Sequence, residues 1–269
     1  MPLPAPGPDT HVLVTGASSG IGAALARSLA ARGYPTVLVA RREEALTEIA
    51  GELGGGATRP RVLAADLVDD AERARVRDVV LGDERVVGVV NAAGYGLTGR
   101  VADLARRDDG AEDLDGLVRL NVLALHDLTV AAVDALVRRG GGAILNVSSI
   151  TAFQPLPGVA SYAASKAFVQ SFSEAVHAEL SGSAVSLTTV SPGLTRTGFG
   201  DAAGTEAFDK APGFTVGDAA DVAEAAVAAM VAGRRTVVPG LVNQLSALGG
   251  QHVPRGLLLP FINSAMDRF

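Results

Sequence analysis

Short apolar runs alternate with longer helical patterns along nearly the whole chain, and this alternation constrains the fold more than any other feature. A strand buried on both faces of a parallel sheet reads as a short apolar run, and the connection to its parallel neighbour usually contains a helix. The runs predict strands at 11–15, 36–40, 61–65, 86–90, 143–148, 185–190 and 236–239. The helical patterns between them lie at 21–32, 43–52, 70–80, 114–139, 161–181 and 218–232. Right-handed crossovers would join these elements into a single-domain Rossmann fold, an α/β architecture with a doubly wound parallel sheet of about seven strands and helices on both faces.

The chain has 269 residues and no internal linker, which fits one domain at 10–269. Residues 1–9 are rich in proline and lack the basic and apolar stretches of a signal peptide, so we expect a flexible lead-in. No run of about 20 apolar residues occurs, so no transmembrane segment is predicted. A net charge of −6 without a basic stripe argues against nucleic acid as a partner. The absence of cysteine excludes disulfides and suits a cytoplasmic protein.

A glycine-rich turn follows the first predicted strand and leads into the first predicted helix. This order is typical of dinucleotide binding, in which backbone N–H groups and the helix dipole hold the pyrophosphate. We expect Gly16 to permit the tight turn, Gly20 to let the pyrophosphate approach the backbone, and Gly22 to let the helix pack close to the sheet. The other predicted donors to the phosphates are Ser18, Ser19 and Ile21.

Two arginines after the second predicted strand bear on the type of cofactor. Arg41 and Arg42 stand where an NAD site needs a carboxylate for the ribose 2′-hydroxyl and an NADP site needs a guanidinium for the 2′-phosphate. A charge-assisted contact is worth roughly 1.5 to 3 kcal/mol, which is enough for a tenfold preference. The sequence therefore favours NADP(H). NAD(H) stays open, because both arginines could instead begin a solvated helix and pair with Glu43 to Glu48.

Tyr162 and Lys166 lie one helical turn apart in the helix predicted at 161–181. A free tyrosine has a pKa of about 10, so proton exchange near neutral pH requires the pKa to fall by roughly 3 units, or about 4 kcal/mol. An ammonium about 4 to 5 Å away contributes roughly 3 to 4 kcal/mol in favour of phenolate. The pair therefore predicts a general acid, although helices also carry this spacing by chance.

Six elements occur together in a fixed order: Thr15-Gly-x-x-x-Gly-x-Gly22, Asn91-Ala-Ala-Gly94, Asn121, Ser149, Tyr162-x-x-x-Lys166 and Pro192-Gly-x-x-x-Thr197. In this order and spacing they resemble the non-extended branch of the short-chain dehydrogenase/reductase family, over nearly the whole chain. The resemblance implies an NAD(P)-dependent enzyme that moves a hydride between the nicotinamide and a carbonyl or secondary alcohol. An epimerase or dehydratase on the same fold usually needs a longer substrate domain than 269 residues provide.

The resemblance also implies roles for four catalytic residues. Ser149 would hydrogen-bond the substrate carbonyl oxygen, with Ser148 as the less favoured alternative. Tyr162 would give that oxygen its proton, while Lys166 would hold the nicotinamide ribose and lower the tyrosine pKa. Asn121 would disrupt the backbone of its helix and link Lys166 to solvent through a water; the alternative is an exposed asparagine on a helix surface.

Further cofactor contacts are implied by the family pattern at the carboxyl ends of the strands. Asp66 would bond the adenine amine, with Leu67 beside the ring. Thr197 would bond the nicotinamide carboxamide, and Gly193 would pass close beneath that ring. The set is completed by Asn91, Ala92, Gly94 and Pro192.

The segment 198–216 lies where this family places its substrate lid, and its glycines suggest mobility. The candidates for the pocket wall are apolar: Leu97, Phe153, Leu156, Phe199, Phe208 and Phe214. Because they include no charged anchor, we expect an uncharged ketone, aldehyde or secondary alcohol as substrate. Aromatic residues in such a loop alternatively anchor the lid to the body.

The C-terminal segment 241–269 is more apolar than a free tail, so we expect it to pack on the body, on another subunit or on a membrane surface. The family resemblance implies a homodimer or homotetramer formed through the two long predicted helices. The four histidines are far apart, and no metal site is predicted. The alternative functions are an NADP(H)-binding sensor with weak catalysis and an NAD-dependent alcohol dehydrogenase.

Overall fold

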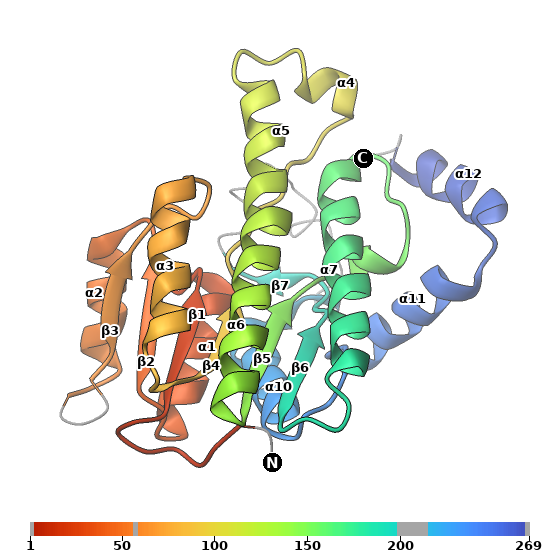
Figure 1. The fold of residues 1–269 in the computed structure, drawn as a ribbon. Helices are drawn as coiled ribbons and strands as arrows, with labels where there is room; N and C mark the ends of the chain where they lie inside the picture. Colours follow the sequence, from red (N-terminus) through yellow and green to blue (C-terminus); the bar gives the residue numbers. More distant parts are fainter. Residues whose placement is uncertain (1–2, 56–58, 198–214, 267–269) are drawn as a thin grey trace.

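The structure, a computed structural model, describes residues 3–55, 59–197 and 215–266 and is built around one parallel sheet. The strands of this sheet are β1 His11–Thr15, β2 Thr36–Ala40, β3 Arg61–Ala64, β4 Val86–Asn91, β5 Gly142–Val147, β6 Val185–Val190 and β9 Thr236–Val237. Their order is β3-β2-β1-β4-β5-β6-β9 in a seven-stranded sheet, which confirms the predicted fold class (Figure 1). Two short strands, β7 Thr195–Arg196 and β8 Gly217–Asp218, form a separate parallel pair.

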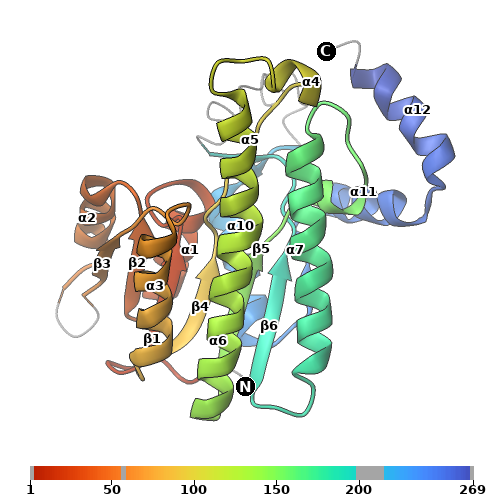
Figure 2. The same ribbon diagram turned by 45° about the horizontal axis from the view of Figure 1, so that its top comes forward.

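Helices cover both faces of the sheet. They are α1 Gly20–Ala31, α2 Glu43–Glu52, α3 Asp70–Gly82, α4 Val101–Leu104, α5 Gly110–Val118, α6 Leu125–Arg139, α7 Ala160–Glu179, α10 Ala219–Val231, α11 Leu241–His252 and α12 Arg255–Met266. A π-helical segment, η2 Arg119–Ala124, and a 3-10 helix, η3 Ile150–Phe153, complete the description. Figures 1 and 2 show α3, α6 and α7 on one face and α1 and α10 on the other.

The side chains of each strand alternate between two cores. Val12 and Val14 of β1 belong to the cluster that includes α1 and α10, while Leu13 belongs to the cluster that includes α3 and α6. Both faces of the strand are buried, which explains why its sequence reads as a continuous apolar run.

The order of the strands reverses between β1 and β4, because the chain leaves β1 toward β2 and returns to β4 on the other side. Such a reversal opens a crevice at the carboxyl ends of the two strands, where ligands of open α/β sheets bind. The glycine-rich turn after β1 therefore lies where the fold leaves room for a dinucleotide.

The N-terminal residues that the structure describes are anchored. Leu3 is only 1% exposed and lies in the core cluster with α1. The Tyr34 hydroxyl donates a hydrogen bond to the Pro4 carbonyl oxygen at 2.8 Å. These contacts contrast with the flexible lead-in expected for residues 1–9.

The long helix predicted at 114–139 begins earlier, as Gly110–Arg139, and contains the π-helical segment η2. By length and mean hydropathy, 1.6 over its most apolar window, it is the one helix of the described residues that could cross a membrane. Half of that window is buried inside the fold, as expected for a helix of the core.

The apolar C-terminal segment forms α11 and α12, which stand beside the sheet (Figure 2). Ala247 of α11 is buried against the body, whereas Leu241, Leu245 and Leu248 on another face are exposed. Packing on the body therefore accounts for one face of α11.

Candidate active site and cofactor site

The glycine-rich turn has the geometry that a phosphate cradle requires. Gly16 has φ +67°, and a Cβ at this position would lie 2.8 Å from the backbone of Ala93 after β4. Gly20 has φ +54°, and Thr197 lies 3.2 Å from the place of its missing Cβ. At Gly22 a Cβ would lie 2.2 Å from the Gly16 carbonyl oxygen, so a side chain would push α1 away from the sheet.

The N-terminus of α1 is free to hold an anion. Ser19 is the N-cap residue but makes no side-chain cap, and the first turn contains no acidic residue. The Arg42 guanidinium reaches back to the Ser18 hydroxyl, which accepts a hydrogen bond at 3.4 Å. Orphan N–H groups, a positive helix end and a neighbouring guanidinium are the features that bind phosphate, so these residues fit a dinucleotide.

The two arginines after β2 are exposed, and in the described part of the chain neither pairs with Glu43 or Glu44. Arg42 is the N-cap residue of α2. Burial raises the pKa of Tyr95 and the nearby Arg41 opposes this rise, which places Arg41 toward the loop after β4. Both guanidinium groups are thus available near the crevice.

Ser149, Tyr162 and Lys166 come together at the carboxyl end of β5. Ser149 follows β5 and caps η3, accepting a hydrogen bond from the Thr151 N–H at 3.2 Å. The Ser149 side chain lies close enough to the Tyr162 phenol to oppose the rise of its pKa. Lys166 Nζ lies 5.8 Å from the centre of the Tyr162 ring. Ser148 instead donates to the Lys166 carbonyl oxygen at 2.9 Å, so Ser149 is the serine that meets the tyrosine.

The expectation that Lys166 lowers the pKa of Tyr162 is wrong in this structure. Burial raises the pKa of Tyr162 to about 12, and only the hydrogen bond with Ser149 opposes the rise. Burial also lowers the pKa of Lys166 to about 8, because the side chain is only 5% exposed. The ammonium donates a hydrogen bond to the Val147 carbonyl oxygen at 3.0 Å. Desolvation is therefore the main cause of both shifts.

Asn121 lies in the π-helical segment η2 and is fully buried, which rules out the exposed alternative. Its Oδ1 accepts from the Tyr95 N–H at 3.1 Å, and its Nδ2 donates to the Tyr95 carbonyl oxygen at 2.9 Å and to the Ser165 hydroxyl at 3.1 Å. Ser165 in turn donates to the Tyr162 carbonyl oxygen at 2.7 Å. Asn121 therefore ties the loop after β4 to the helix that carries Tyr162.

Gly94 completes this end of the site. A Cβ there would lie 2.9 Å from Asn121 Oδ1 and 3.4 Å from Lys166 Nζ. The loop after β4 thus passes directly over the asparagine and the lysine, and only a residue without a side chain fits without displacing them.

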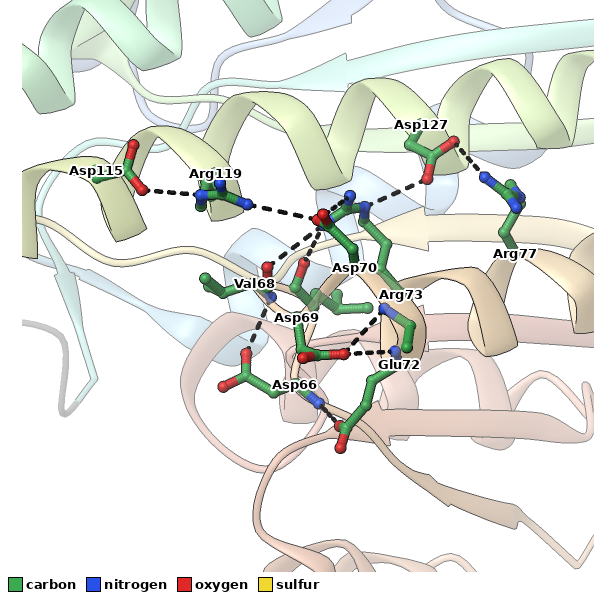
Figure 3. A network of polar contacts seen from close by, with 12 residues as sticks. Asp66, Val68, Asp69, Asp70, Glu72, Arg73, Arg77, Asp115, Arg119 and Asp127 are labelled. Carbon is green, nitrogen blue, oxygen red and sulfur yellow. Dashed lines mark hydrogen bonds and ion pairs between the residues drawn. The ribbon is translucent and has the colours of Figure 1, made fainter. Parts of the chain in front are cut away.

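A polar network fixes the loop after β3, at the end of the crevice assigned to adenosine (Figure 3). Arg73 is buried and donates to the Leu67 carbonyl oxygen at 3.1 Å, and it pairs with Asp70 at 2.7 Å and Asp127 at 3.3 Å. Asp66 accepts from the Val68 N–H at 3.0 Å. Beside this network a cavity of about 610 Å³ is lined by Asp66, Val68, Asp69, Ala111, Glu112, Asp115, Gly116 and Arg119.

Two residues that were predicted to contact the cofactor have side chains buried inside the protein. The Leu67 side chain is buried in the core cluster of α3 and α6, so it is not open to an adenine ring. The Asn91 Nδ2 donates to Asn146 Oδ1 at 2.9 Å and to the Thr129 hydroxyl at 3.1 Å, inside the protein. The Asn91 amide therefore joins β4 to β5 and α6.

The other predicted residues lie at the expected strand ends. Ala92 and Ala93 bind the Thr15 hydroxyl through their N–H groups, at 3.0 and 3.1 Å. Pro192 is buried and accepts from the Ile150 N–H at 3.0 Å, while Thr197 lies beside the glycine-rich turn at Gly20.

The pocket-wall candidates Leu97, Phe153 and Leu156 are half-buried, on loops that meet where the Gly99 N–H donates to the Gly158 carbonyl oxygen at 2.7 Å. Phe199, Phe208 and Phe214, with most of the expected lid, lie outside the described residues.

Sequence reasoning missed three residues that hold the site together: Thr15, Arg73 and Tyr95. Thr15 and Arg73 bond backbone groups of a loop through their side chains, and Tyr95 offers its own backbone N–H and carbonyl oxygen to Asn121. Only Thr15, at the end of a buried strand and directly before the glycine-rich turn, carried a signal that could have identified it.

Comparisons with known proteins identify the family of the chain. Residues 10–207 match the family described as short chain dehydrogenase. Sulfoacetaldehyde reductase 2 from Chromohalobacter salexigens is 38% identical over 195 residues, which cover 70% of this chain and 73% of that protein. The solved structure of a short-chain dehydrogenase from Sphingobium yanoikuyae in complex with NADPH has a TM-score of 0.79 and 33% identity, over 93% of this chain and 95% of that one. The bulky-bulky ketone specific alcohol dehydrogenase from Comamonas testosteroni has a TM-score of 0.75 and 28% identity, over 97% of this chain and 94% of that one.

A Rossmann sheet with a phosphate cradle and a neighbouring serine, tyrosine and lysine define an oxidoreductase that uses a nicotinamide cofactor. The chain belongs to the short-chain dehydrogenase/reductase family, and it acts on carbonyl or alcohol groups.

Proposed function

We propose that the protein is an NADP(H)-preferring reductase in which Tyr162 gives a proton to the oxygen of an uncharged carbonyl substrate. The observation that carries this proposal is the position of the Lys166 ammonium, 5.8 Å from the centre of the Tyr162 ring, with the Ser149 side chain close enough to the phenol to affect its pKa. When bound, the nicotinamide supplies the hydride that adds to the carbonyl carbon.

The pKa of Tyr162 sets the protonation state of the phenol before the reaction. With a pKa of about 12 the phenol stays protonated at neutral pH, and it is therefore ready to donate. Its proton goes to the oxygen as the carbon–oxygen double bond becomes a single bond. To act as the base in the reverse reaction at neutral pH, the phenol would have to lose a proton at a cost of roughly 7 kcal/mol.

Ser149 and Lys166 assist this proton transfer. The Ser149 hydroxyl, beside the Tyr162 phenol, can donate to the same substrate oxygen and stabilise the charge that develops on it. Lys166 has a pKa of about 8 and so carries its charge at neutral pH, where its ammonium can hold the hydroxyls of the nicotinamide ribose beside the phenol.

The preference for NADP(H) rests on the two exposed arginines beside the phosphate cradle. Arg42 already contacts Ser18 in the turn, and Arg41 lies toward the loop after β4. Either guanidinium can pair with a 2′-phosphate, whereas a ribose 2′-hydroxyl would need an acceptor that these residues do not supply.

The proposed substrate is an uncharged ketone or aldehyde, because the described candidates for the pocket wall, Leu97, Phe153 and Leu156, are all apolar and half-buried. A second candidate is a small sulfonate aldehyde, favoured by the 38% identity to a protein named sulfoacetaldehyde reductase 2.

One steady-state screen tests the proposal. Oxidation of NADPH and of NADH is followed with sulfoacetaldehyde and with a series of bulky uncharged ketones and aldehydes. We expect kcat/KM to be at least tenfold higher with NADPH and higher for an uncharged carbonyl. Equal use of both coenzymes would reject the arginine argument, and a clear preference for sulfoacetaldehyde would replace the first substrate class by the second.

A further inference from the structure

Gly193 lies in the loop between β6 and β7, residues 191–194, at the nicotinamide end of the proposed site. Its φ is not among the positive values of the described glycines, so its backbone conformation does not require glycine. Glycine is required at this position because there is no space for a side chain. A Cβ on Gly193 would lie 2.2 Å from Oδ1, 2.6 Å from Cγ and 2.6 Å from Nδ2 of Asn243.

Asn243 belongs to α11, and its amide is held in place from the other side. Its Nδ2 donates to the Pro239 carbonyl oxygen at 2.7 Å, and Gly240 is the second glycine against which the amide packs, 3.2 Å from the place of the missing Cβ. The side chain therefore fills the space between the end of β9 and the β6–β7 loop. If it rotated away, it would lose the bond to Pro239.

The same face of α11 reaches the loop that carries Ser149. Asn243, Ala247 and Gly250 follow the spacing of one helix face, and Ala247 is buried. At Gly250 a Cβ would lie 3.1 Å from the Phe153 carbonyl oxygen at the end of η3. The helix thus contacts the β6–β7 loop near its start and η3 near its end.

The two loops are also bonded to each other. The Ile150 N–H, next to Ser149, donates to the Pro192 carbonyl oxygen at 3.0 Å. A shift of the β6–β7 loop therefore moves the start of η3, and with it the serine that meets Tyr162.

We infer that Asn243 is a positioning residue for the nicotinamide end of the cofactor site: it fixes the β6–β7 loop through Gly193, and Gly193 must be glycine because of Asn243. This inference rests on the proposed function only in naming the nicotinamide cofactor as the ligand beside the loop. Asn243 itself touches a loop and acts through it.

A cycle of three variants tests the inference: Gly193→Ala, Asn243→Ala and the double variant. Each is measured by the NADPH dissociation constant, by kcat and KM, and by the melting temperature of the protein without cofactor. Leu245→Ala is the matched control, because Leu245 is on the same helix but 70% exposed.

We expect Gly193→Ala to weaken NADPH binding about tenfold or more and to lower the melting temperature by roughly 2 to 6 °C. Asn243→Ala alone should weaken NADPH binding only about two- to fivefold. The NADPH dissociation constant of the double variant should lie within about threefold of that of Asn243→Ala, because removing the asparagine amide makes room for the alanine methyl group. Substrate KM should change less than NADPH KM in all three. The control should behave as the wild type.

A double variant as impaired as Gly193→Ala would overturn the inference, since it would mean that the cofactor, and not Asn243, excludes the methyl group. If Gly193→Ala does not fold, Asn243→Gln tests the inference in its place. The variant with the longer glutamine side chain should bind NADPH more weakly than Asn243→Ala does, and equal or tighter binding overturns the inference. Failure of the wild type to bind NADPH would instead reject the proposed function. The melting temperatures of the three variants would still show whether Asn243 is what excludes a side chain at position 193.

Discussion

The buried ammonium of Lys166 should destabilise the fold at neutral pH, and replacing it by an apolar side chain of similar length should relieve this cost. Burial lowers the pKa of Lys166 from 10.5 to about 8, which corresponds to about 3 kcal/mol of differential interaction. Lys166→Met removes this cost but also loses the hydrogen bond to the Val147 carbonyl oxygen, worth about 1 kcal/mol. The variant should therefore be about 2 kcal/mol more stable than the wild type at pH 7, and inactive.

The sign of the effect depends on pH. Between the folded pKa of about 8 and the unfolded value of 10.5, the unfolded chain still binds a proton that the native protein has lost. The free energy of unfolding of the wild type therefore gains a contribution that rises with pH across this window, and the same contribution is lost as pH falls through about 8. Lys166→Met lacks this contribution, so its advantage should shrink and disappear toward pH 10.

Urea unfolding followed by circular dichroism at a series of pH values from about 7 to 10 measures the difference. Arg42→Met, which removes an exposed cation, is the control and should differ little from the wild type at any pH. A Lys166→Met variant that is less stable than the wild type at pH 7, or whose difference does not vary with pH, would refute the description of Lys166 as a desolvated ammonium.

Three further predictions concern the cradle, the cofactor and the assembly. Arg41→Ala combined with Arg42→Ala should raise the KM for NADPH at least about tenfold and leave that for NADH nearly unchanged, and the single variants show which guanidinium matters more; a parallel loss with both coenzymes would contradict the assignment. Gly22→Ala should cost about 1 to 3 kcal/mol in urea unfolding and weaken NADPH binding, because its Cβ would lie 2.2 Å from the Gly16 carbonyl oxygen; an unchanged midpoint would show that α1 can shift freely. The family resemblance implies an oligomer formed through α6, so Val130→Lys, on the exposed outer face of this helix, should shift the mass measured by light scattering toward that of the monomer. An unchanged mass would mean that the interface lies elsewhere.

The sheet could be predicted from the sequence because its central strands are buried on both faces and end at turns. The runs at 11–15, 36–40 and 185–190 coincide with β1, β2 and β6. The C-terminal helices were not predicted, because Gly249, Gly250 and Pro254 interrupt the helical pattern and Pro260 lies inside α12.

The positions of the proposed catalytic residues could be predicted, but not their pKa values. Spacing alone brings Tyr162 and Lys166 to one face of α7, and the motif order brings Ser149 to the same strand end. The pKa values depend on how deeply the two groups are buried, and burial is a property of the packed molecule. For the same reason, the sequence does not reveal that the Asn91 side chain points into the protein, since its partner Asn146 is 55 residues away in the sequence.

Proton donation by Tyr162 is tested most directly by Tyr162→Phe, which keeps the ring and removes only the hydroxyl. Turnover of NADPH with the best carbonyl substrate and NADPH affinity by fluorescence titration are measured on the same preparations. We expect kcat to fall by roughly a hundred- to ten-thousand-fold while the NADPH dissociation constant stays within about threefold. A variant that keeps its turnover within tenfold of the wild type would contradict the account.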